Sequence, residues 1–523
     1  MTETTLPVFI QQMLQPGFYP HPVQEPIQLI QTHVSYVLLT GDYAYKVKKP
    51  VDFGFLNYAT LDKRRHFCQE ELRLNQRTAA ELYLAVLPIV QAGDRFQLAS
   101  QPNPPTESII DYAVQMRQFP QDALLTACFD RGELTESRLQ ALAQAIAAFH
   151  QTTVTSDYIR SFGEIASVRQ SIDENYDQTE QYIGGPQTQQ QFDETRHYTD
   201  RFFAERQDLF QDRMESDRIR ECHGDLHLRN ICDWQGRLWL FDCIEFNEPF
   251  RFVDVMFDIA YIVMDLLARE RPDLSTCFLN AYAEASGDWD GLHILPLYVS
   301  RQSYVRAKVT SFLLNDPGIP SEDKQSISET AALYYRLAWQ LSQPRTGRLI
   351  IMSGLSGSGK TTLGRAIATA LEGIHIRSDA VRKHLGGVPL YERGGDDLYT
   401  PAMTAQTYDR LLSLGIKLAQ DGYTVILDAK YDRQDYRQAA IAQAQAAQLP
   451  LHLVHCDAPL DLLAARLQAR TGDIADANVD ILRQQTFQPF SSDEQPYVIS
   501  LDAAQSPADL LQQTLATLKA TDH

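Results

Sequence analysis

The residues with the clearest chemical meaning form a glycine-rich run, GLSGSGKT, from Gly354 to Thr361. The run fits the pattern G-x-x-x-x-G-K-[ST] at every fixed position, between a strand-like stretch and a helix-like one. Glycines let consecutive backbone N–H groups turn toward phosphate, and the following helix N-terminus adds positive potential. We therefore predict that Lys360 contacts the β- and γ-phosphates of ATP and that Thr361 ligates Mg²⁺. The predicted ATP-binding residues are Gly354, Leu355, Ser356, Gly357, Ser358, Gly359, Lys360, Thr361 and Thr362.

A second apolar run further along the chain, Tyr423–Asp428, ends in a carboxylate. This arrangement is typical of the strand whose terminal aspartate helps to hold Mg²⁺ beside a phosphate-binding loop. We therefore predict Asp428 as a Mg²⁺ ligand together with Thr361. An ordinary surface aspartate at a strand end is the alternative.

Another group of chemically suited residues is the run His223–Asn230, with the sequence HGDLHLRN. It fits the pattern H-x-D-x-x-x-x-N, and Asp242 follows Asn230 by twelve residues, at the end of the strand-like run LWLF. The spacing predicts that Asp225 orients and deprotonates an acceptor hydroxyl, while Asn230 and Asp242 hold Mg²⁺ against the phosphates of ATP. A polar loop with an aspartate turn is the alternative.

Chemistry of this second kind also needs a strand lysine paired with a helix glutamate, which orient the α- and β-phosphates. Lys46 in the strand-like run YAYKVKKPV is the candidate, and Lys48 on the same strand face is its rival. In the helix expected from Leu61 to about Leu84, Glu71 falls inside the apolar stripe and Glu70 falls outside it. A carboxylate among apolar neighbours needs a cation, so we predict the pair Lys46–Glu71.

The elements that would position these residues fall into two domains, separated at Gln343–Gly347. Upstream, strand-like runs and a long charged helix precede a mostly helical stretch, which is the outline of a two-lobed kinase. Downstream, strand-like runs such as Arg348–Ser353 alternate with helical segments, which predicts a parallel sheet flanked by helices. The predicted fold class is α/β and α+β: residues 1–342 form a protein-kinase-like domain, 343–347 a linker, and 348–523 a parallel-sheet P-loop NTPase domain.

The loop HGDLHLRN, with the acidic pair Asp254-x-x-x-Asp258 after it, resembles the aminoglycoside phosphotransferase-like kinase family over about residues 25–340. That family includes choline and homoserine kinase relatives, so the resemblance implies an ATP-dependent kinase without fixing its acceptor. One departure is the run Gln31–Ser35, which has no glycine where the family usually has a glycine-containing nucleotide loop. A degenerate kinase-like domain that only senses a ligand is therefore the alternative.

Asp379 and Arg382 stand three residues apart at the start of an expected helix, in the run HIRSDAVRKHL. Together with the glycine-rich loop, this run resembles the P-loop kinases of the polynucleotide kinase, gluconate kinase and zeta toxin group, from about Arg348 to Pro489. The resemblance implies that Asp379 accepts the proton of the acceptor hydroxyl and that Arg382 grips the substrate. A helix cap beside a solvated arginine is the alternative.

Arg466 and Arg470 lie four residues apart in LDLLAARLQARTGD and resemble the lid arginines that close over ATP in these kinases. Guanidinium groups suit the charge that develops on a transferring phosphoryl group. A solvated basic helix face is the alternative. Arg433 and Arg437, which follow the strand that ends at Asp428, are weaker candidates for substrate contact.

The 523-residue chain has a formal net charge of −20, so its surface repels phosphate backbones and anionic lipids, and general nucleic-acid binding is disfavoured. The N-terminal run MTETTLPVFIQQMLQ lacks the features of a signal peptide, and no apolar run is long enough for a membrane span. Seven scattered cysteines without a C-x-x-C pair indicate a reduced, cytoplasmic protein. Zinc binding is disfavoured, because the four candidate ligands lack paired spacing. They are Cys222, His223, His227 and Cys232.

Together these patterns predict a fusion of two kinase domains, each binding ATP and Mg²⁺ and transferring the γ-phosphoryl group to a hydroxyl of a small molecule. Asp225 and Asp379 are the two predicted bases. One alternative is a regulatory ATP-binding protein whose kinase-like lobe senses a ligand, and the other is a toxin-like or nucleic-acid-end kinase. The sequence specifies neither the acceptor nor the oligomeric state, and it predicts no membrane partner.

Overall fold

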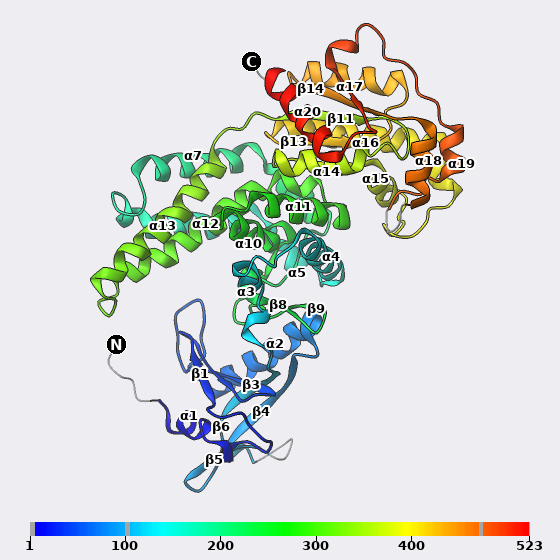
Figure 1. The fold of residues 1–523 in the computed structure, drawn as a ribbon. Helices are drawn as coiled ribbons and strands as arrows, with labels where there is room; N and C mark the ends of the chain where they lie inside the picture. Colours follow the sequence, from blue (N-terminus) through cyan, green and yellow to red (C-terminus); the bar gives the residue numbers. More distant parts are fainter. Residues whose placement is uncertain (1–5, 100–104, 470–473, 522–523) are drawn as a thin grey trace. The chain divides into compact units, whose positions relative to one another are not determined.

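The computed structural model describes residues 6–99, 105–469 and 474–521 of the chain (Figure 1). By its internal contacts the chain divides into two compact units. The first unit comprises Met1–Thr135, Phe149–Asp265 and Leu297–Trp339, and the second comprises Glu136–Ala148, Leu266–Pro296 and Gln340–His523. Each unit carries one of the two predicted groups of site residues.

An antiparallel sheet of six strands, in the order β1-β2-β3-β6-β4-β5, forms the first part of the first unit. Its strands are β1 (Gln28–Gln31), β2 (Ser35–Leu39), β3 (Tyr43–Lys48), β4 (Tyr83–Ala92), β5 (Arg95–Leu98) and β6 (Ile109–Arg117). Helix α2 (Leu61–Ala79) begins after Thr60, whose side chain accepts a hydrogen bond from the backbone N–H of Lys63 at 3.3 Å. The helix packs against β4 and β6, and this packing brings Glu71 to the lysines of β3.

Helices form most of the chain between β6 and residue 342, together with two small antiparallel sheets. One sheet pairs β7 (Ile219–Glu221) with β10 (Phe252–Asp254), and the other pairs β8 (Ile231–Trp234) with β9 (Arg237–Leu240). The loop His223–Asn230 connects β7 to β8, so both sheets position it. The helices are α3 (Leu125–Asp130), α4 (Glu136–Thr152), α5 (Asp157–Arg160), α6 (Ile165–Thr179), α7 (Gln189–Glu205), α8 (Gln207–Glu215), α9 (Glu248–Arg251), α10 (Val255–Ala268), α11 (Pro272–Ser286), α12 (Leu295–Phe312) and α13 (Ser321–Ser342), and α1 (Val8–Met13) precedes the six-stranded sheet.

A parallel sheet of five strands, in the order β12-β13-β11-β14-β15, forms the core of the second unit. Its strands are β11 (Arg348–Ser353), β12 (Ile374–Arg377), β13 (Thr424–Asp428), β14 (Leu451–Asp457) and β15 (Val498–Asp502). Consecutive residues of β11, such as Ile350 and Ile351, are fully buried, as expected for a sheet covered on both faces. The helices of this part are α14 (Lys360–Ala370), α15 (Ser378–Leu385), α16 (Pro401–Gln420), α17 (Gln434–Ala446), α18 (Leu460–Ala469), α19 (Val479–Gln484) and α20 (Pro507–Thr521).

Helix α11 precedes the predicted linker in sequence but belongs to the second unit. The side-chain amide of Asn280 donates to the carbonyl oxygen of Gly373 at 2.9 Å, and its Oδ1 accepts from the N–H of His375 at 2.7 Å. The second unit therefore extends upstream of residues 343–347, and a domain boundary there stays a prediction.

The predicted fold class is confirmed: a domain with an antiparallel sheet and a helical part precedes a parallel-sheet domain. The helix predicted from Leu61 to about Leu84 ends earlier, at Ala79, because β4 begins at Tyr83. No helix among the described residues is both long enough and apolar enough to cross a membrane.

Candidate functional site

The glycine-rich loop connects β11 to α14, as its pattern predicts. Gly354 and Gly357 have positive φ angles of 132° and 85°. A Cβ atom at Gly354 would lie 2.3 Å from the carbonyl oxygen of Cys456, and one at Gly357 would lie 2.6 Å from that of Leu463. Both positions require glycine, because a side chain would collide with backbone atoms and would also strain φ. Close contact with β14 and α18 thus fixes the path of the loop.

Lys360, the first residue of α14, folds back over this loop. Its Nζ donates to the carbonyl oxygen of Leu355 at 2.8 Å and to Oγ of Ser358 at 3.5 Å, and the residue is 8% exposed. Burial lowers the pKa of Lys360, and the nearby Asp428 opposes this shift. Both hydrogen bonds go to neutral oxygens, so the ammonium group is well suited to an anionic phosphate oxygen.

Asp428 ends β13 beside the phosphate loop, because Met352 of β11 pairs with it across the sheet. Its Oδ2 lies 3.2 Å from Nε2 of His375. Burial raises the pKa of Asp428 and His375 lowers it, and the result is a pKa of about 2. The carboxylate is therefore ionised at neutral pH, and with the hydroxyl of Thr361 it offers the hard oxygen ligands that suit Mg²⁺.

A cavity of about 730 Å³ lies between the phosphate loop and helices α15 and α16. A cavity of this size is in the range of nucleotide and small-molecule sites. The predicted site residues that line it are Ser356, Gly357, Ser358, Gly359, Lys360, Thr361, Thr362, Asp379, Arg382, Asp428 and Arg466, together with the weaker candidate Arg433. The structure thus brings the phosphate loop and the predicted base into one cavity.

Arg382 is fixed within this cavity by its neighbours. Its Nη1 donates to the carbonyl oxygen of Leu398 at 2.8 Å and to Oγ1 of Thr404 at 3.2 Å. Its guanidinium group lies 5.2 Å from the centre of the Tyr399 ring. These contacts hold the guanidinium group in one place, so it is already ordered for a substrate.

The remaining arginines differ in their placement. Arg466 donates from Nη2 to the carbonyl oxygen of Ala503 at 2.8 Å and lines the cavity. Arg470 lies outside the described residues. Arg437 is fully buried, and its Nε donates to Glu494 at 2.7 Å, so it stabilises the fold and is not among the residues that line the cavity.

Three of the predicted residues of the first unit, Lys46, Glu71 and Asp242, are joined through contacts of Lys46. Lys46 Nζ lies 2.8 Å from Oε1 of Glu71 and donates to Oδ1 of Asp242 at 2.6 Å. The rival Lys48 donates to Oε2 of the same Glu71 at 2.6 Å and also to Oε1 of Glu245. Glu71 is therefore shared by both lysines, where the sequence predicts one partner.

This group of charges contains two ammonium groups and three carboxylates, and of these the Asp242 side chain is 43% exposed. Burial raises the pKa of Glu71, but the positive charges of Lys46 and Lys48 outweigh burial and hold the pKa below its ordinary value. Burial also raises the pKa of Asp242, but Lys46 and Lys48 together hold it below its ordinary value. Both carboxylates are ionised, and the surplus negative charge suits a divalent cation at Asp242.

Asp225 and Asn230 lie together in the loop between β7 and β8. Nδ2 of Asn230 donates to the carbonyl oxygen of Asp225 at 2.9 Å and to its Oδ2 at 3.1 Å. His227 Nε2 lies 3.2 Å from the same Oδ2. Burial raises the pKa of Asp225, but the nearby His227, His223 and Arg306 together hold it below its ordinary value. The carboxylate is therefore ionised and can accept a proton from a hydroxyl.

Asp258 of α10 holds the backbone of this loop. Its Oδ2 accepts from the N–H of His223 at 3.0 Å, and its Oδ1 accepts from the N–H of Gly224 at 2.8 Å. His150 Nε2 lies 3.0 Å from Oδ2. The sequence pattern marks Asp258 as one of an acidic pair, and the structure shows that it positions the loop.

The zinc alternative can be compared with the observed side chains. Within the described ranges, one set of three potential metal ligands lies close together, and it consists of His150, Cys222 and Asp258. It shares only Cys222 with the set considered from the sequence. Cys232 of that set packs in an apolar cluster beside Trp239.

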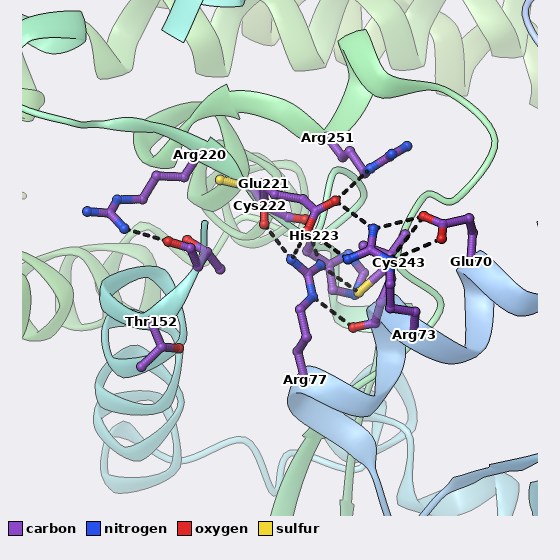
Figure 2. A network of polar contacts seen from close by, with 12 residues as sticks. Glu70, Arg73, Arg77, Thr152, Arg220, Glu221, Cys222, His223, Cys243 and Arg251 are labelled. Carbon is purple, nitrogen blue, oxygen red and sulfur yellow. Dashed lines mark hydrogen bonds and ion pairs between the residues drawn. The ribbon is translucent and has the colours of Figure 1, made fainter. Parts of the chain in front are cut away.

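Figure 2 shows a cluster of arginines around Glu221, the last residue of β7. Arg73 of α2 donates to Glu221 at 2.8 Å, and Arg77 of α2 and Arg251 of α9 each donate to it at 3.3 Å. Arg77 also donates to the carbonyl oxygen of Cys222, the residue after Glu221, at 3.1 Å. The cluster ties the helix that carries the predicted glutamate to the start of the loop HGDLHLRN. No pattern in the sequence indicates this link.

The turn between β1 and β2 has no glycine, and a threonine closes it instead. Oγ1 of Thr32 accepts from the N–H groups of Val34 at 3.2 Å and Ser35 at 2.9 Å. Lys49 Nζ donates to the carbonyl oxygen of Thr32 at 2.6 Å. This turn is therefore ordered by side chains rather than by glycine conformations.

Known proteins are similar to both parts of the chain. Residues 349–488 match a family model described as an AAA domain. The fold joins a domain with a six-stranded antiparallel sheet and a helical part to a parallel-sheet P-loop domain. The chain belongs to the same family as the uncharacterized protein Rv2004c of Mycobacterium tuberculosis (strain ATCC 25618 / H37Rv). The two are 31% identical over 467 residues, which cover 88% of this chain and 90% of the relative.

Two further proteins are similar to one part each. Gluconokinase of Gluconobacter oxydans (strain 621H) is 28% identical over 181 residues, which cover 34% of this chain and 93% of that protein. The predicted resemblance of the C-terminal part to P-loop kinases is confirmed. The structure of amicoumacin kinase in complex with AMP-PNP, Ca²⁺ and its ligand aligns with a TM-score of 0.38 and 14% identity, over 64% of this chain and 92% of that one.

Proposed function

We propose that the protein is an ATP-dependent phosphotransferase that transfers the γ-phosphoryl group of ATP to a hydroxyl of a small molecule, with one site in each unit. The observation that carries the proposal is one cavity lined by Lys360, Asp428 and Asp379, the predicted phosphate-binding lysine, metal-binding carboxylate and base. The gluconokinase relative supports this reaction for the second unit.

In the second unit, the loop residues position the nucleotide and Asp379 acts on the acceptor. When bound, ATP supplies the phosphoryl group and Mg²⁺ offsets part of its charge. Thr361 and Asp428 would hold the cation. Lys360 would neutralise charge on the γ-phosphate as the acceptor oxygen bonds to phosphorus and the bond to the bridging oxygen breaks. Asp379 would take the hydroxyl proton, and the electron pair of the broken bond leaves with ADP.

In the first unit, the same roles fall to residues on different elements. Asp225 would take the hydroxyl proton, and Asn230 and Asp242 would hold the cation. Lys46, fixed by Glu71, would bind the α- and β-phosphates. The contacts between these side chains support the proposal, because side chains that are already held in place need little rearrangement before phosphoryl transfer.

Transfer of labelled phosphate tests the proposal directly. Wild type and the variants Lys360→Ala and Asp225→Asn are given γ-labelled ATP and a fractionated metabolite extract, with Lys417→Ala on the exposed face of α16 as the matched control. We expect distinct labelled products, each lost in only one of the two site variants. Loss of labelled product in the Lys360 variant alone would show that transfer takes place only in the second unit. ATP binding without any labelled product would contradict the proposal and favour a regulatory protein.

A further inference from the structure

The side chain of His375 joins strand β12 of the parallel sheet to Asp428, the predicted cation ligand. His375 pairs with Ile426 of β13, so Asp428, two residues further along β13, is its diagonal neighbour on the same face of the sheet. Nε2 of His375 lies 3.2 Å from Oδ2 of Asp428. An ionised carboxylate only accepts hydrogen bonds, so the imidazole ring is the donor. Asp428 lines the cavity and His375, which is 6% exposed, does not, so the ring acts on the cavity through Asp428.

Helix α14, which begins with Lys360, leaves room for this ring at Gly364. A Cβ atom at Gly364 would lie 2.9 Å from Nε2 of His375, the atom that contacts Asp428. Glycine is less favourable than alanine inside a helix, so a buried glycine at this position indicates that the space is needed. Thr361, the other predicted cation ligand, lies one turn earlier in the same helix. The ring therefore packs against both elements that carry the predicted cation ligands.

Helix α11 holds the strand on which His375 lies. Strand β12 is at one end of the sheet order, so among the described strands only β13 pairs with it. Asn280 of α11 binds the other edge of β12, because its Nδ2 donates to the carbonyl oxygen of Gly373 and its Oδ1 accepts from the N–H of His375. The two distances are 2.9 Å and 2.7 Å. Asn280 therefore fixes the backbone from which the imidazole ring reaches Asp428.

We propose that His375 is a positioning residue of the second unit, whose ring orients Asp428 for the cation that binds with ATP, while Gly364 and Asn280 keep the ring in place. A hydrogen bond to one carboxylate oxygen limits rotation of the carboxylate, so its orientation is set before a cation binds. Asn280 precedes the predicted linker, so a helix upstream of the P-loop domain supports the cation site of that domain. The inference rests on the proposed function, because it concerns the cation of that kinase site.

The Mg²⁺ dependence of nucleotide binding tests this role. Variants are made in the full chain carrying Asp242→Asn, so that calorimetry with a non-hydrolysable ATP analogue reports on the second unit. We expect His375→Leu to lower the Mg²⁺ affinity of the analogue-bound site about 10- to 100-fold, with a much smaller change in analogue affinity measured without Mg²⁺. His375→Gln, whose amide can still donate to Asp428, should keep most of the Mg²⁺ affinity. Unchanged Mg²⁺ affinity in His375→Leu overturns the proposal.

Two further substitutions test how the ring is held. Gly364→Ala should displace the ring and lower Mg²⁺ affinity in the same way as His375→Leu. Gly415→Ala in α16 is the matched control, because its Cβ would lie 2.9 Å from the apolar side chain of Leu349, and it should leave Mg²⁺ affinity unchanged. Equal losses of Mg²⁺ affinity in the two glycine variants overturn the role of Gly364. Asn280→Ala should lower Mg²⁺ affinity in the chain with His375 and have no further effect in His375→Leu, and equal losses in both would overturn the role of Asn280.

Phosphoryl transfer separates this inference from the proposed function. The acceptor is an extract fraction whose labelling is lost in Lys360→Ala. We expect His375→Leu to raise the Mg²⁺ concentration needed for half the maximal rate about 10- to 100-fold, with a smaller change in kcat. A lower kcat with an unchanged Mg²⁺ requirement overturns the positioning role and leaves the kinase function in place.

The opposite failure is also distinguishable. If no labelled product from any fraction depends on Lys360, the kinase function of the second unit is refuted. In that case the calorimetric Mg²⁺ affinity of the His375 variants still decides whether His375 orients Asp428.

Discussion

Replacing Glu71 with glutamine tests how the first unit holds its two lysines. Glu71 is fully buried and lies 2.8 Å from Lys46 Nζ and 2.6 Å from Lys48 Nζ. Lys46 also contacts Asp242, and Lys48 also contacts Glu245. Glutamine keeps the shape of the side chain and removes its charge, so each ammonium group retains one carboxylate.

The expected magnitude follows from these retained partners. Removing one member of a buried ion pair costs about 3–5 kcal/mol when the other charge is left alone. Because both lysines keep a partner, we expect Glu71→Gln to lower the free energy of unfolding of the first unit by about 2 kcal/mol. Lys46 would then be held by Asp242 alone, the predicted metal ligand. We therefore expect ATP affinity at this site to fall about tenfold or more, which is about 1.4 kcal/mol.

Two assays measure these effects. Urea unfolding followed by tryptophan fluorescence reports mainly on the first unit, because three of the four tryptophans lie there. Calorimetry in a Lys360→Ala background reports ATP affinity at the first site alone. Glu70→Gln is the matched control, because Glu70 pairs with the half-exposed Arg73 and should change stability by less than about 1 kcal/mol. Equal effects of the Glu70 and Glu71 substitutions would refute the reasoning.

Two further predictions concern the second unit. Gly357→Ala should abolish ATP binding in the second unit, because its Cβ would lie 2.6 Å from the carbonyl oxygen of Leu463 and the residue would keep a φ of 85°. Gly17→Ala is the control and should leave ATP binding unchanged, because no atom lies within 4 Å of its Cβ position. Calorimetric ATP binding equal to wild type in the Gly357 variant would contradict this prediction. Beside His375 the pKa of Asp428 falls from its ordinary 3.8 to about 2. The ionised carboxylate therefore stabilises the fold above about pH 4, and roughly 2 kcal/mol of the free energy of unfolding is lost as the pH falls toward 2. In Asp428→Asn this loss of stability should be absent when urea unfolding is measured between pH 5 and 2. Equal pH dependence of stability in the wild type and the variant would show that Asp428 does not cause the loss.

Much of each site could be predicted because local patterns determine it. The phosphate loop requires a strand before it and a helix after it, and the sequence shows both around GLSGSGKT. Glu71 could be distinguished from Glu70 because helical geometry places only one of them in the apolar stripe. The structure agrees, since Glu71 is fully buried and Glu70 forms its ion pair with Arg73 at the surface.

Other contacts could not be predicted, because they depend on how elements pack. The two-residue period of a strand puts Lys46 and Lys48 on one face, but it cannot show that both reach Glu71 or that Glu245 takes the second one. The arginine cluster at Glu221 likewise joins residues from α2, β7 and α9, which no spacing rule connects. Such long-range pairs follow from the tertiary structure alone.

The central claim is that one chain holds two separate ATP sites, and the number of nucleotides bound per chain tests it most directly. Isothermal titration calorimetry with a non-hydrolysable ATP analogue and Mg²⁺ should give two bound molecules for the wild type. It should give one for Lys360→Ala and one for Asp242→Asn. A wild-type value of one, or a value of two that persists in the Lys360 variant, would contradict the claim.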